Sequence, residues 1–348
     1  MTAITIPILL IIIATISVLL FILTATLFYQ KYQSNKITKQ KQHYIHTFKD
    51  DWYEFLMNGA QGSVAMIPKT DSEYSAIETI FLSYLKNMHT QKSTIRIYDF
   101  ANEYLISHYE KQLASRKWST KMNALYRIYD FRISELLPQC EQLKLEQLDD
   151  DMLLQLLKIY ALLQPAKLFD FVLSPSRDLP EIDYKQLFMI IESRSLQKFM
   201  DHFEQLQPHA QVALIDAVGL SQNTVHLPQL IQLLQSEDVE IRIRTLKVLC
   251  QLSHVGDLTV YEPFTSSPIW EERLMVAKIL RNYPIEESLP LLQTLLEDTH
   301  YQVRYEASQT FTGAKNGARW IQQFLNSSTD VYAVDMVKSS LKQKGLKV

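Results

Sequence analysis

The pentapeptide Arg96-Ile97-Tyr98-Asp99-Phe100 returns thirty-one positions later as Arg127-Ile128-Tyr129-Asp130-Phe131, and Lys158-Ile159-Tyr160 follows after the same interval. The same interval separates Arg242, Arg273 and Arg304 in the second half of the chain. A fixed period of about 20 to 50 residues is typical of proteins built from stacked repeats. We therefore expect one repeat length to run through most of this chain.

Composition favours helices over a mixed sheet. The 348 residues include only seven glycines. Enzymes with mixed helices and strands use glycine in phosphate-binding loops and tight turns, so a low glycine content indicates helices joined by short loops. No apolar and polar alternation typical of strands is sustained along the chain. The sequence thus predicts an all-α fold.

The N-terminal segment has the composition of a membrane anchor. The first thirty residues carry no Asp, Glu, Lys or Arg, and the twenty-one residues 8–28 are almost wholly apolar. A helix of that length spans about 31 Å, which matches the hydrocarbon core of a bilayer. A cleaved signal peptide is the alternative, but it would have a basic start and an apolar stretch of about 7 to 15 residues. We predict that residues 1–30 form one transmembrane helix.

Basic residues follow this segment and none precedes it. They are Lys31, Lys36, Lys39 and Lys41. The positive-inside rule then places the N-terminus outside and the rest of the chain on the cytoplasmic side of the cell membrane. Two isolated cysteines, Cys140 and Cys250, suit a reducing compartment, with a disulfide between them as the alternative. A formal net charge of −3 weighs against a nucleic-acid partner.

Residues 31–57 continue in a helical pattern with one apolar stripe. The stripe consists of Ile45, Phe48, Trp52, Phe55 and Leu56. A juxtamembrane amphipathic helix of this kind can lie on the inner leaflet, or it can cap the open end of a repeat stack. Capping is the interpretation that we favour. The stretch 58–70 contains two of the glycines and is predicted to be a linker.

Residues 71–348 are expected to form the repeat stack. Asp71 is the predicted N-cap of its first helix. The buried face of that helix should contain Ile77, Ile80, Phe81, Tyr84, Leu85 and Met88. Later helices are expected over 95–109, 118–133 and 152–163, the last started by the acidic run 149–151. Between Met189 and Asp216 the phase slips by about four residues, which indicates a shortened loop or helix.

Two blocks in the second half repeat at twice the period. Leu227-Pro228 opens an apolar segment that leads to Ile241-Arg242, and Leu289-Pro290 leads to Val303-Arg304, with Ala307 three residues on. The segment 270–277 fills the place between them. This pattern resembles the short bacterial type of HEAT repeat, the type also seen in phycobiliprotein lyases. The resemblance covers about 208–341 and reaches 95–192 only through the period.

The resemblance implies a right-handed α-solenoid of helical hairpins with a period of about thirty-one residues. Some positions depart from the pattern. Asp335 stands where arginine is expected, and Thr245 and Val276 stand where alanine is expected. The last repeat is therefore interpreted as a divergent cap.

The arginines that open the second helix of each repeat, Arg242, Arg273 and Arg304, have the regular spacing of a structural ladder. We expect them to bind acidic side chains of adjacent turns, such as Asp238 and Asp298. A role in ligand binding is the alternative.

The concave face of an α-solenoid is an extended surface for binding. Exposed basic residues on the second helices are expected to make a stripe that suits an acidic protein segment, and a solvated face without a partner is the alternative. These candidate protein-binding residues are Arg127, Lys158, Arg244, Lys247, Lys278 and Arg281.

No catalytic motif is present: neither a P-loop, a GxGxxG turn, a GxSxG elbow nor an HExxH helix. His43 and His46 have no carboxylate or cysteine at metal-ligand spacing. We therefore expect no cofactor, no metal and no small-molecule substrate. The sequence predicts a membrane-anchored cytoplasmic scaffold for a membrane-associated protein, such as an enzyme of envelope biosynthesis.

The alternative is a HEAT-type modifying enzyme or lyase-like protein that uses the repeats as a substrate cradle. A buried cleft that groups acidic residues with His202, His209 or His254 would favour it.

Overall fold

The computed structural model describes residues 6–87, 90–253 and 256–345. Throughout these residues the regular secondary structure is helical, without a strand, as the composition predicted. The chain divides into two compact units, Met1–Ile159 and Tyr160–Val348, with the border inside helix α8, Asp150–Leu163. We call them unit 1 and unit 2.

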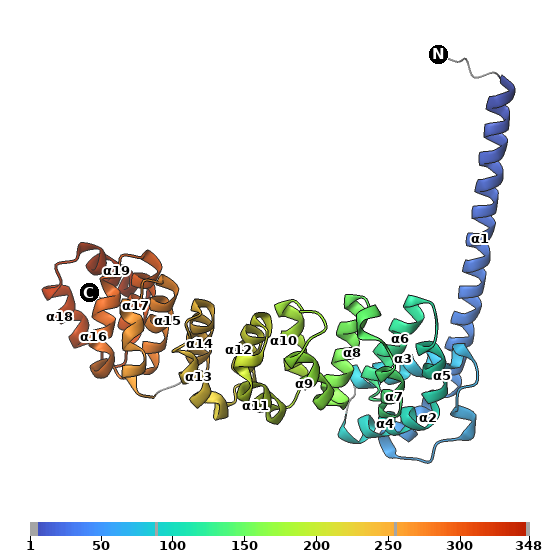
Figure 1. Cartoon of the computed structure of the whole chain (residues 1–348), viewed down its shortest axis with the longest axis horizontal. Coiled ribbons are helices and arrows are strands. Elements are labelled where there is room, and N and C mark those ends of the chain that lie inside the picture. Colours follow the sequence, from blue (N-terminus) through green and yellow to red (C-terminus); the bar gives the residue numbers. More distant parts are fainter. Residues whose placement is uncertain (1–5, 88–89, 254–255, 346–348) are drawn as a thin grey trace. The chain divides into compact units, whose positions relative to one another are not determined.

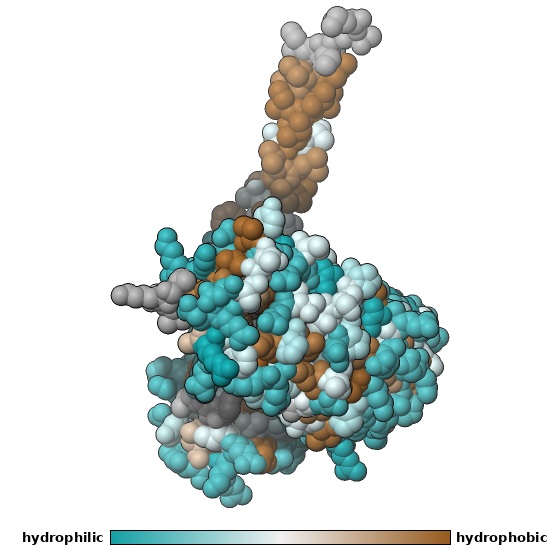
Figure 2. Space-filling view, turned by 90° about the vertical axis from the view of Figure 1, so that its left-hand side faces the viewer, coloured by the Kyte–Doolittle hydropathy of each residue, from teal (hydrophilic) through white to brown (hydrophobic). Residues whose placement is uncertain are grey.

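Helix α1, Ile6–Thr47, is one continuous helix of 42 residues (Figure 1). Its apolar side chains from residue 8 to residue 29 are exposed, and no part of its apolar window is buried. Figure 2 shows this uncovered apolar surface in brown. Helix α1 is therefore long and apolar enough to span a membrane, and it does not serve as a buried core helix. It continues unbroken through the predicted border at residue 30.

The other helical segments of unit 1 are short. They are α2 Lys49–Tyr53, the π-helix η1 Glu54–Asn58, η2 Val64–Met66, α3 Asp71–Asn87, α4 Gln91–Tyr104, α5 Ile106–Leu113, α6 Trp118–Asp130, η3 Ser134–Leu136, α7 Leu137–Glu141, η4 Leu145–Gln147 and α8.

Two predictions for unit 1 are wrong in detail. Thr70, not Asp71, caps α3, because its hydroxyl accepts from the Glu73 N–H while the Glu73 carboxylate accepts from the Thr70 N–H. The single helix expected over 95–109 is divided at Leu105 into α4 and α5. Of the predicted buried face of α3, Ile77, Ile80 and Phe81 are buried and Tyr84 and Leu85 partly so, while Met88 lies outside the described residues.

An aromatic cluster forms the core of unit 1 next to α1. The fully buried ring of Trp52 meets the rings of Phe55, Phe81 and Phe100 edge to face, at centroid distances of 5.8, 5.1 and 5.0 Å. Such arrangements stabilise a core beyond their buried area. The apolar stripe of residues 45–56 thus packs into unit 1, as capping requires, instead of offering Trp52 to a lipid surface.

The predicted linker 58–70 is also attached to this core. Met66 is 2 % exposed, and its carbonyl accepts a hydrogen bond from the Tyr44 hydroxyl of α1 at 2.5 Å. Gly59 closes the π-helix η1 with φ at +77°, and a Cβ there would lie 2.5 Å from the guanidinium of Arg96. That guanidinium donates to the Leu56 carbonyl at 2.6 Å.

The two pentapeptides occupy matching places in the core. Ile97 and Ile128 are both buried. Phe100 and Phe131 each lie with their ring centroid 5.6 Å from that of Phe81 and nearly perpendicular to it. The two pentapeptides therefore fill one structural position twice, as the period indicated.

Unit 2 holds the remaining segments. They are α9 Pro165–Leu173, α10 Glu181–Ile190, α11 Ser193–Asp201, η5 Phe203–Gln205, α12 Pro208–Ser221, η6 Thr224–His226, α13 Leu227–Leu233, α14 Val239–Gln251, η7 Leu258–Val260, η8 Glu262–Ser266, α15 Trp270–Ile279, η9 Leu280–Asn282, α16 Ile285–Leu296, α17 Tyr301–Gly313, α18 Ala318–Ser327 and α19 Val331–Gln343.

Six of these helices, α10, α12, α14, α15, α17 and α19, pack one upon the next, and we call them the helix row. Helices α12, α14, α15 and α17 begin thirty-one residues apart, at Pro208, Val239, Trp270 and Tyr301. Helix α10 begins only 27 residues before α12, at Glu181, and has ten residues against fourteen. The four-residue slip therefore appears in the start of α10, while Lys185 of α10 and Asp216 of α12 keep the thirty-one-residue spacing.

Small side chains let neighbouring helices of the row approach closely. Ala277 and Ala307 are fully buried, and the Thr310 hydroxyl of α17 donates to the Ala277 carbonyl of α15 at 2.8 Å. A Cβ on Gly219 of α12 would lie 2.8 Å from a Val248 methyl group of α14. Thr245 stands where alanine was expected, and its hydroxyl donates to the Ile241 carbonyl of its own helix. Close contact of this kind brings a side-chain hydroxyl of one helix within hydrogen-bonding reach of the backbone of the next.

We expect Trp52→Ala to lower the free energy of unfolding of unit 1 by about 3–5 kcal/mol, because a large ring leaves a cavity in a packed core. Tyr53→Ala is the matched control, since Tyr53 is 44 % exposed and surface changes cost about 0.5 kcal/mol or less. Urea unfolding of the full chain in a non-ionic detergent, followed by far-UV circular dichroism, measures both. Equal transitions for the two variants would contradict the core role of Trp52.

Candidate functional site

The three regularly spaced arginines repeat one backbone contact. In Arg242, Arg273 and Arg304 alike, Nη1 donates to the carbonyl oxygen of the residue six positions earlier, at 2.6–2.7 Å. Each arginine therefore fastens the turn before its own helix. Carbonyls in such turns otherwise lack partners, so the contact is a structural one.

Two of these arginines also bind a buried carboxylate that belongs to the next part of the row. The Nε of Arg242 lies 2.7 Å from Glu272, and Arg273 binds both oxygens of Asp298, at 2.5 and 2.9 Å. Asp298 is thus a partner, as expected. Asp238 is not, because it caps α14 by accepting from the N–H groups of Glu240 and Ile241.

Arg127, predicted to be a binding residue, is internally paired in unit 1. Its guanidinium lies 3.1 Å from Glu78 and 2.9 Å from Asp130, and its side chain is 23 % exposed. Glu78 also accepts from the buried hydroxyl of Tyr109, thirty-one residues away. Burial raises the pKa of Asp130, and the positive charge of Arg127 offsets part of that rise. Lys158 is partly buried on α8.

Arg244 is the clearest departure from the predicted basic stripe. It contacts three carboxylates, Glu240 at 2.6 Å, Asp216 at 2.9 Å and Glu181 at 3.1 Å, and its side chain is 22 % exposed. The prediction that Arg244 is exposed for a partner is therefore wrong. Nearly buried Asp216 also accepts from Lys185 at 2.8 Å and joins α10, α12 and α14. Its position one period after Lys185 was the signal that could have revealed this pair.

One position of the helix row is polar in all six helices, and we call it the polar slot. Its residues, each thirty-one after the last, are Lys185, Asp216, Lys247, Lys278, Gln309 and Ser340. At the two ends the slot is paired internally, by the Lys185–Asp216 contact and by Gln309 donating to Ser340 at 3.2 Å.

In the middle of the polar slot two lysines follow one another on the neighbouring helices α14 and α15. Lys247 is exposed and Lys278 partly exposed. Within the described residues neither has an ion pair or a hydrogen bond through its side chain. Like charges on adjacent helices repel, so these lysines form a basic site whose charge the row itself does not balance.

Further basic side chains lie near this pair. Burial raises the pKa of the Cys250 thiol. The positive charges of Lys278 and Arg281 lower that pKa in part. Arg281 contacts Glu306 and remains 60 % exposed. Lys344 donates to the Gln309 carbonyl and the Thr312 hydroxyl, and burial, followed by the Arg281 charge, lowers its pKa.

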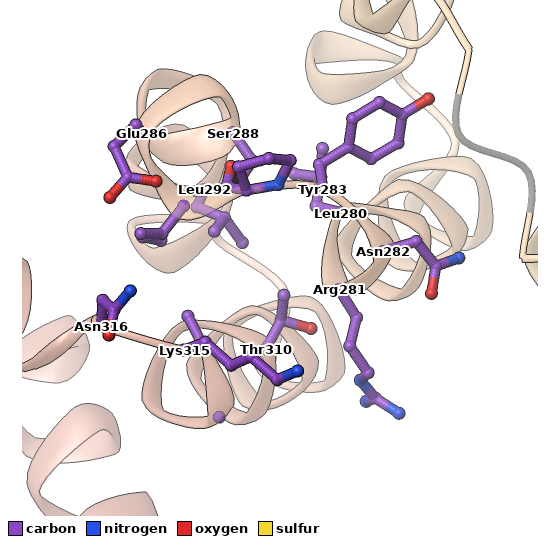
Figure 3. A pocket seen from close by; sticks show the side chains of 14 residues that line it. Leu280, Arg281, Asn282, Tyr283, Glu286, Ser288, Leu292, Thr310, Lys315 and Asn316 are labelled. Carbon is purple, nitrogen blue, oxygen red and sulfur yellow. Dashed lines mark hydrogen bonds between the residues drawn. The ribbon is translucent and has the colours of Figure 1, made fainter.

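A pocket of about 470 Å³ opens beside Arg281, between η9, α16 and α17 (Figure 3). Leu292 and Thr310 line its inside, and Arg281 and Lys315 lie at its edge. The ring of Tyr283 points away from the pocket, and its hydroxyl accepts from the Gly256 N–H at 3.0 Å. The pocket therefore combines an apolar wall with charged residues of both signs, because Glu286 lines it together with Arg281 and Lys315.

Of the histidines named for an enzymatic cleft, the two that the structure describes have separate partners. His209 binds Asp178 at 2.8 Å with both side chains substantially exposed, and His202 contacts the carbonyl of Lys198. His254 lies outside the described residues. Across those residues there is no group of three or more His, Cys, Asp or Glu placed to hold a metal ion. Cys140 and Cys250 are free thiols, and burial raises the pKa of Cys140 to about 12.

Comparison with known proteins adds little. No family model matches the chain. No curated protein matches it either. One solved structure of an engineered protein is 13 % identical with a TM-score of 0.34, covering 90 % of this chain and 99 % of that one. A second engineered protein is 14 % identical with a TM-score of 0.25, covering 78 % and 97 %. Similarity at this level carries no argument about fold or function.

We expect Arg273→Leu to destabilise unit 2 by about 3–5 kcal/mol, because the carboxylate of Asp298, only 5 % exposed, would lose its partner in the interior. Arg194→Leu is the matched control, because Arg194 is exposed on α11 and surface changes cost about 0.5 kcal/mol or less. Urea unfolding at pH 7 compares the two. A cost below about 1 kcal/mol for Arg273→Leu would show that the arginine contacts do not hold the row together.

Proposed function

We propose that the chain is a single-pass membrane protein whose N-terminus lies outside and whose helical units lie in the cytoplasm, where they form a HEAT-like α-solenoid that binds another protein. The observation that carries this proposal is the uncovered apolar half of α1, joined without a break to a folded helical unit. Exposed apolar surface on this scale is stable in a bilayer and not in water.

The basic flank of α1 supports the orientation. Lys31, Lys36 and Lys39 are exposed and Lys41 partly so, directly after the apolar segment. These side chains are free to contact anionic headgroups of the inner leaflet, which favour basic residues next to a membrane span.

The helix row supports the HEAT-like interpretation. Four of its helices begin thirty-one residues apart, and one arginine contact recurs in the successive helices α14, α15 and α17. Hydrogen bonds also join side chains one period apart, as between Gln309 and Ser340 and between Ser328 and Glu297. Contacts between nearest neighbours only are what a repeat stack uses for stability.

The unpaired lysines of the polar slot support a protein partner with an acidic segment. Lys247 and Lys278 are positively charged, adjacent in the row and without an internal acid among the described residues. An acidic segment that docked there would remove the repulsion between them and gain two ion pairs.

The orientation is tested with a C-terminal reporter that is active only in the cytoplasm, compared with one that is active only outside. We expect activity of the cytoplasmic reporter alone, in the membrane fraction. Replacement of Lys31, Lys36, Lys39 and Lys41 by Gln should reduce that preference, because the positive-inside signal is then lost. A C-terminus outside the membrane would overturn the orientation, and a cleaved, soluble product would overturn the anchor.

Partner binding is tested by crosslinking in intact cells and purification in detergent. We expect a discrete set of membrane proteins with wild type and at least about tenfold less of it with Lys247→Glu/Lys278→Glu, since two attractive contacts become repulsive. Lys338→Glu/Lys342→Glu is the matched control, because it changes the same charge at exposed lysines of α19. If both double variants recover the same proteins as wild type, the polar slot is not the binding site.

A further inference from the structure

A second position of the helix row is aromatic in its last three helices, and in the last two it carries an exposed tyrosine. The residues at this position, each thirty-one after the last, are Pro208, Val239, Trp270, Tyr301 and Tyr332. Tyr301 is 60 % exposed and Tyr332 73 %, whereas most other apolar residues of the row are buried. We call Trp270, Tyr301 and Tyr332 the aromatic ladder. Trp270 is partly exposed. A position that keeps tyrosines at the surface of two successive helices does not serve the core there.

The contacts place these rings along one edge of the row. Trp270 is the first residue of α15 and stacks on His300, the residue before α17, with ring centroids 4.1 Å apart. Arg304, in the first turn of α17, lies with its guanidinium 5.6 Å from the ring centroid of Tyr332 in the first turn of α19. The N-terminal ends of α15, α17 and α19 therefore lie side by side.

The same edge is strongly acidic. The segments 236–242, 267–273, 297–304 and 328–335, which contain these helix starts, carry nine Asp and Glu, three Arg and no Lys. Three of the carboxylates, those of Glu240, Glu272 and Asp298, are paired with arginines. Among the described residues, six have no arginine partner: Glu237, Asp238, Glu271, Glu297, Asp330 and Asp335. Asp238 and Asp330 cap helices by accepting N–H groups.

Aromatic rings flanked by carboxylates are suited to cations. A guanidinium or ammonium group is attracted to the face of an aromatic ring and to a nearby carboxylate at once. Arg304 over Tyr332 shows that the ladder accepts a guanidinium at its side. A partner segment rich in Arg or Lys would therefore match this edge, and an acidic segment would be repelled.

The spacing of the ladder limits the shape of that segment. Packed helices lie about 8–10 Å apart, and an extended chain advances about 3.1–3.4 Å per residue. Three residues of extended chain therefore match one step of the ladder. We propose that the aromatic ladder of unit 2 docks an extended basic segment of a partner protein, with Arg or Lys at every third residue. This surface is separate from the polar slot and does not depend on the proposed anchor.

The test uses full-length protein in non-ionic detergent and a fluorescent peptide of four Arg-Gly-Ser repeats, with binding followed by anisotropy at low salt. A peptide of the same composition with its four arginines clustered, and one with Glu in place of Arg, are the comparison probes. We expect the spaced arginine peptide to bind at least about tenfold more tightly than the clustered one, and the Glu peptide to show no binding to the ladder.

Tyr301→Ala/Tyr332→Ala should weaken binding of the spaced peptide at least about tenfold, since two ring contacts are lost while the charge is unchanged. Tyr53→Ala/Tyr126→Ala, at exposed tyrosines of unit 1, should leave it within about twofold. Glu271→Gln/Glu297→Gln should weaken it and reduce its salt dependence.

Equal affinity for the spaced and clustered peptides, or unchanged binding after loss of both ladder tyrosines, would overturn the proposal. The Lys247→Glu/Lys278→Glu variant should still bind the spaced peptide, so the ladder and the polar slot can fail independently.

Discussion

Packing between neighbouring helices of the row is the interaction on which unit 2 depends. Its helices have only ten to fourteen residues, and helices of that length are marginal in water without a partner. Each inner helix of the row is covered by the helix before it and the helix after it. Ala277, Ala307 and Gly219 make that cover close enough for a hydroxyl of one helix to reach the backbone of the next. The arginine contacts then fix the turns between the layers.

A constant period has a further effect, because it repeats every position of the helix surface as well as the core. One fully buried position repeats as Thr245, Val276 and Ala307, and two other positions repeat as the polar slot and the aromatic ladder. Carboxylates gather where the helices begin, and Lys247, Lys278, Arg281 and Lys344 follow later in the helices or after them. The row therefore has two edges of opposite charge, and each favours a different partner chemistry.

The period made much of this predictable from the sequence. It located the helices, the contact of Arg273 with Asp298 and the shared core position of Phe100 and Phe131, because those features depend on neighbours one repeat away. It did not reveal that Arg244 is bound by Glu181, sixty-three residues earlier, and by Asp216. The repeat spacing can predict the same exposure for two residues of one helix. Which of them contacts carboxylates depends on how deeply its side chain is packed.

Local features were also harder to predict than repeated ones. The break at Leu105 and the cap at Thr70 depend on a few side chains, with no second copy in the sequence to indicate them. Tyr44 was missed for the same reason, although its hydroxyl joins α1 to the segment after the π-helix. In a chain with strong repetition, the sequence therefore predicts the stacked helices well and the irregular N-terminal region poorly.

That irregular start has a mechanical consequence. Helix α1 has no hinge between its apolar part and Tyr44, its first buried residue. Fourteen residues separate Tyr44 from residue 30, which in a helix corresponds to about 21 Å. In the proposed orientation this segment is a stiff spacer, and it would set the height of unit 1 above the bilayer. A membrane partner of unit 1 would then need a domain that extends about that far from the lipid surface.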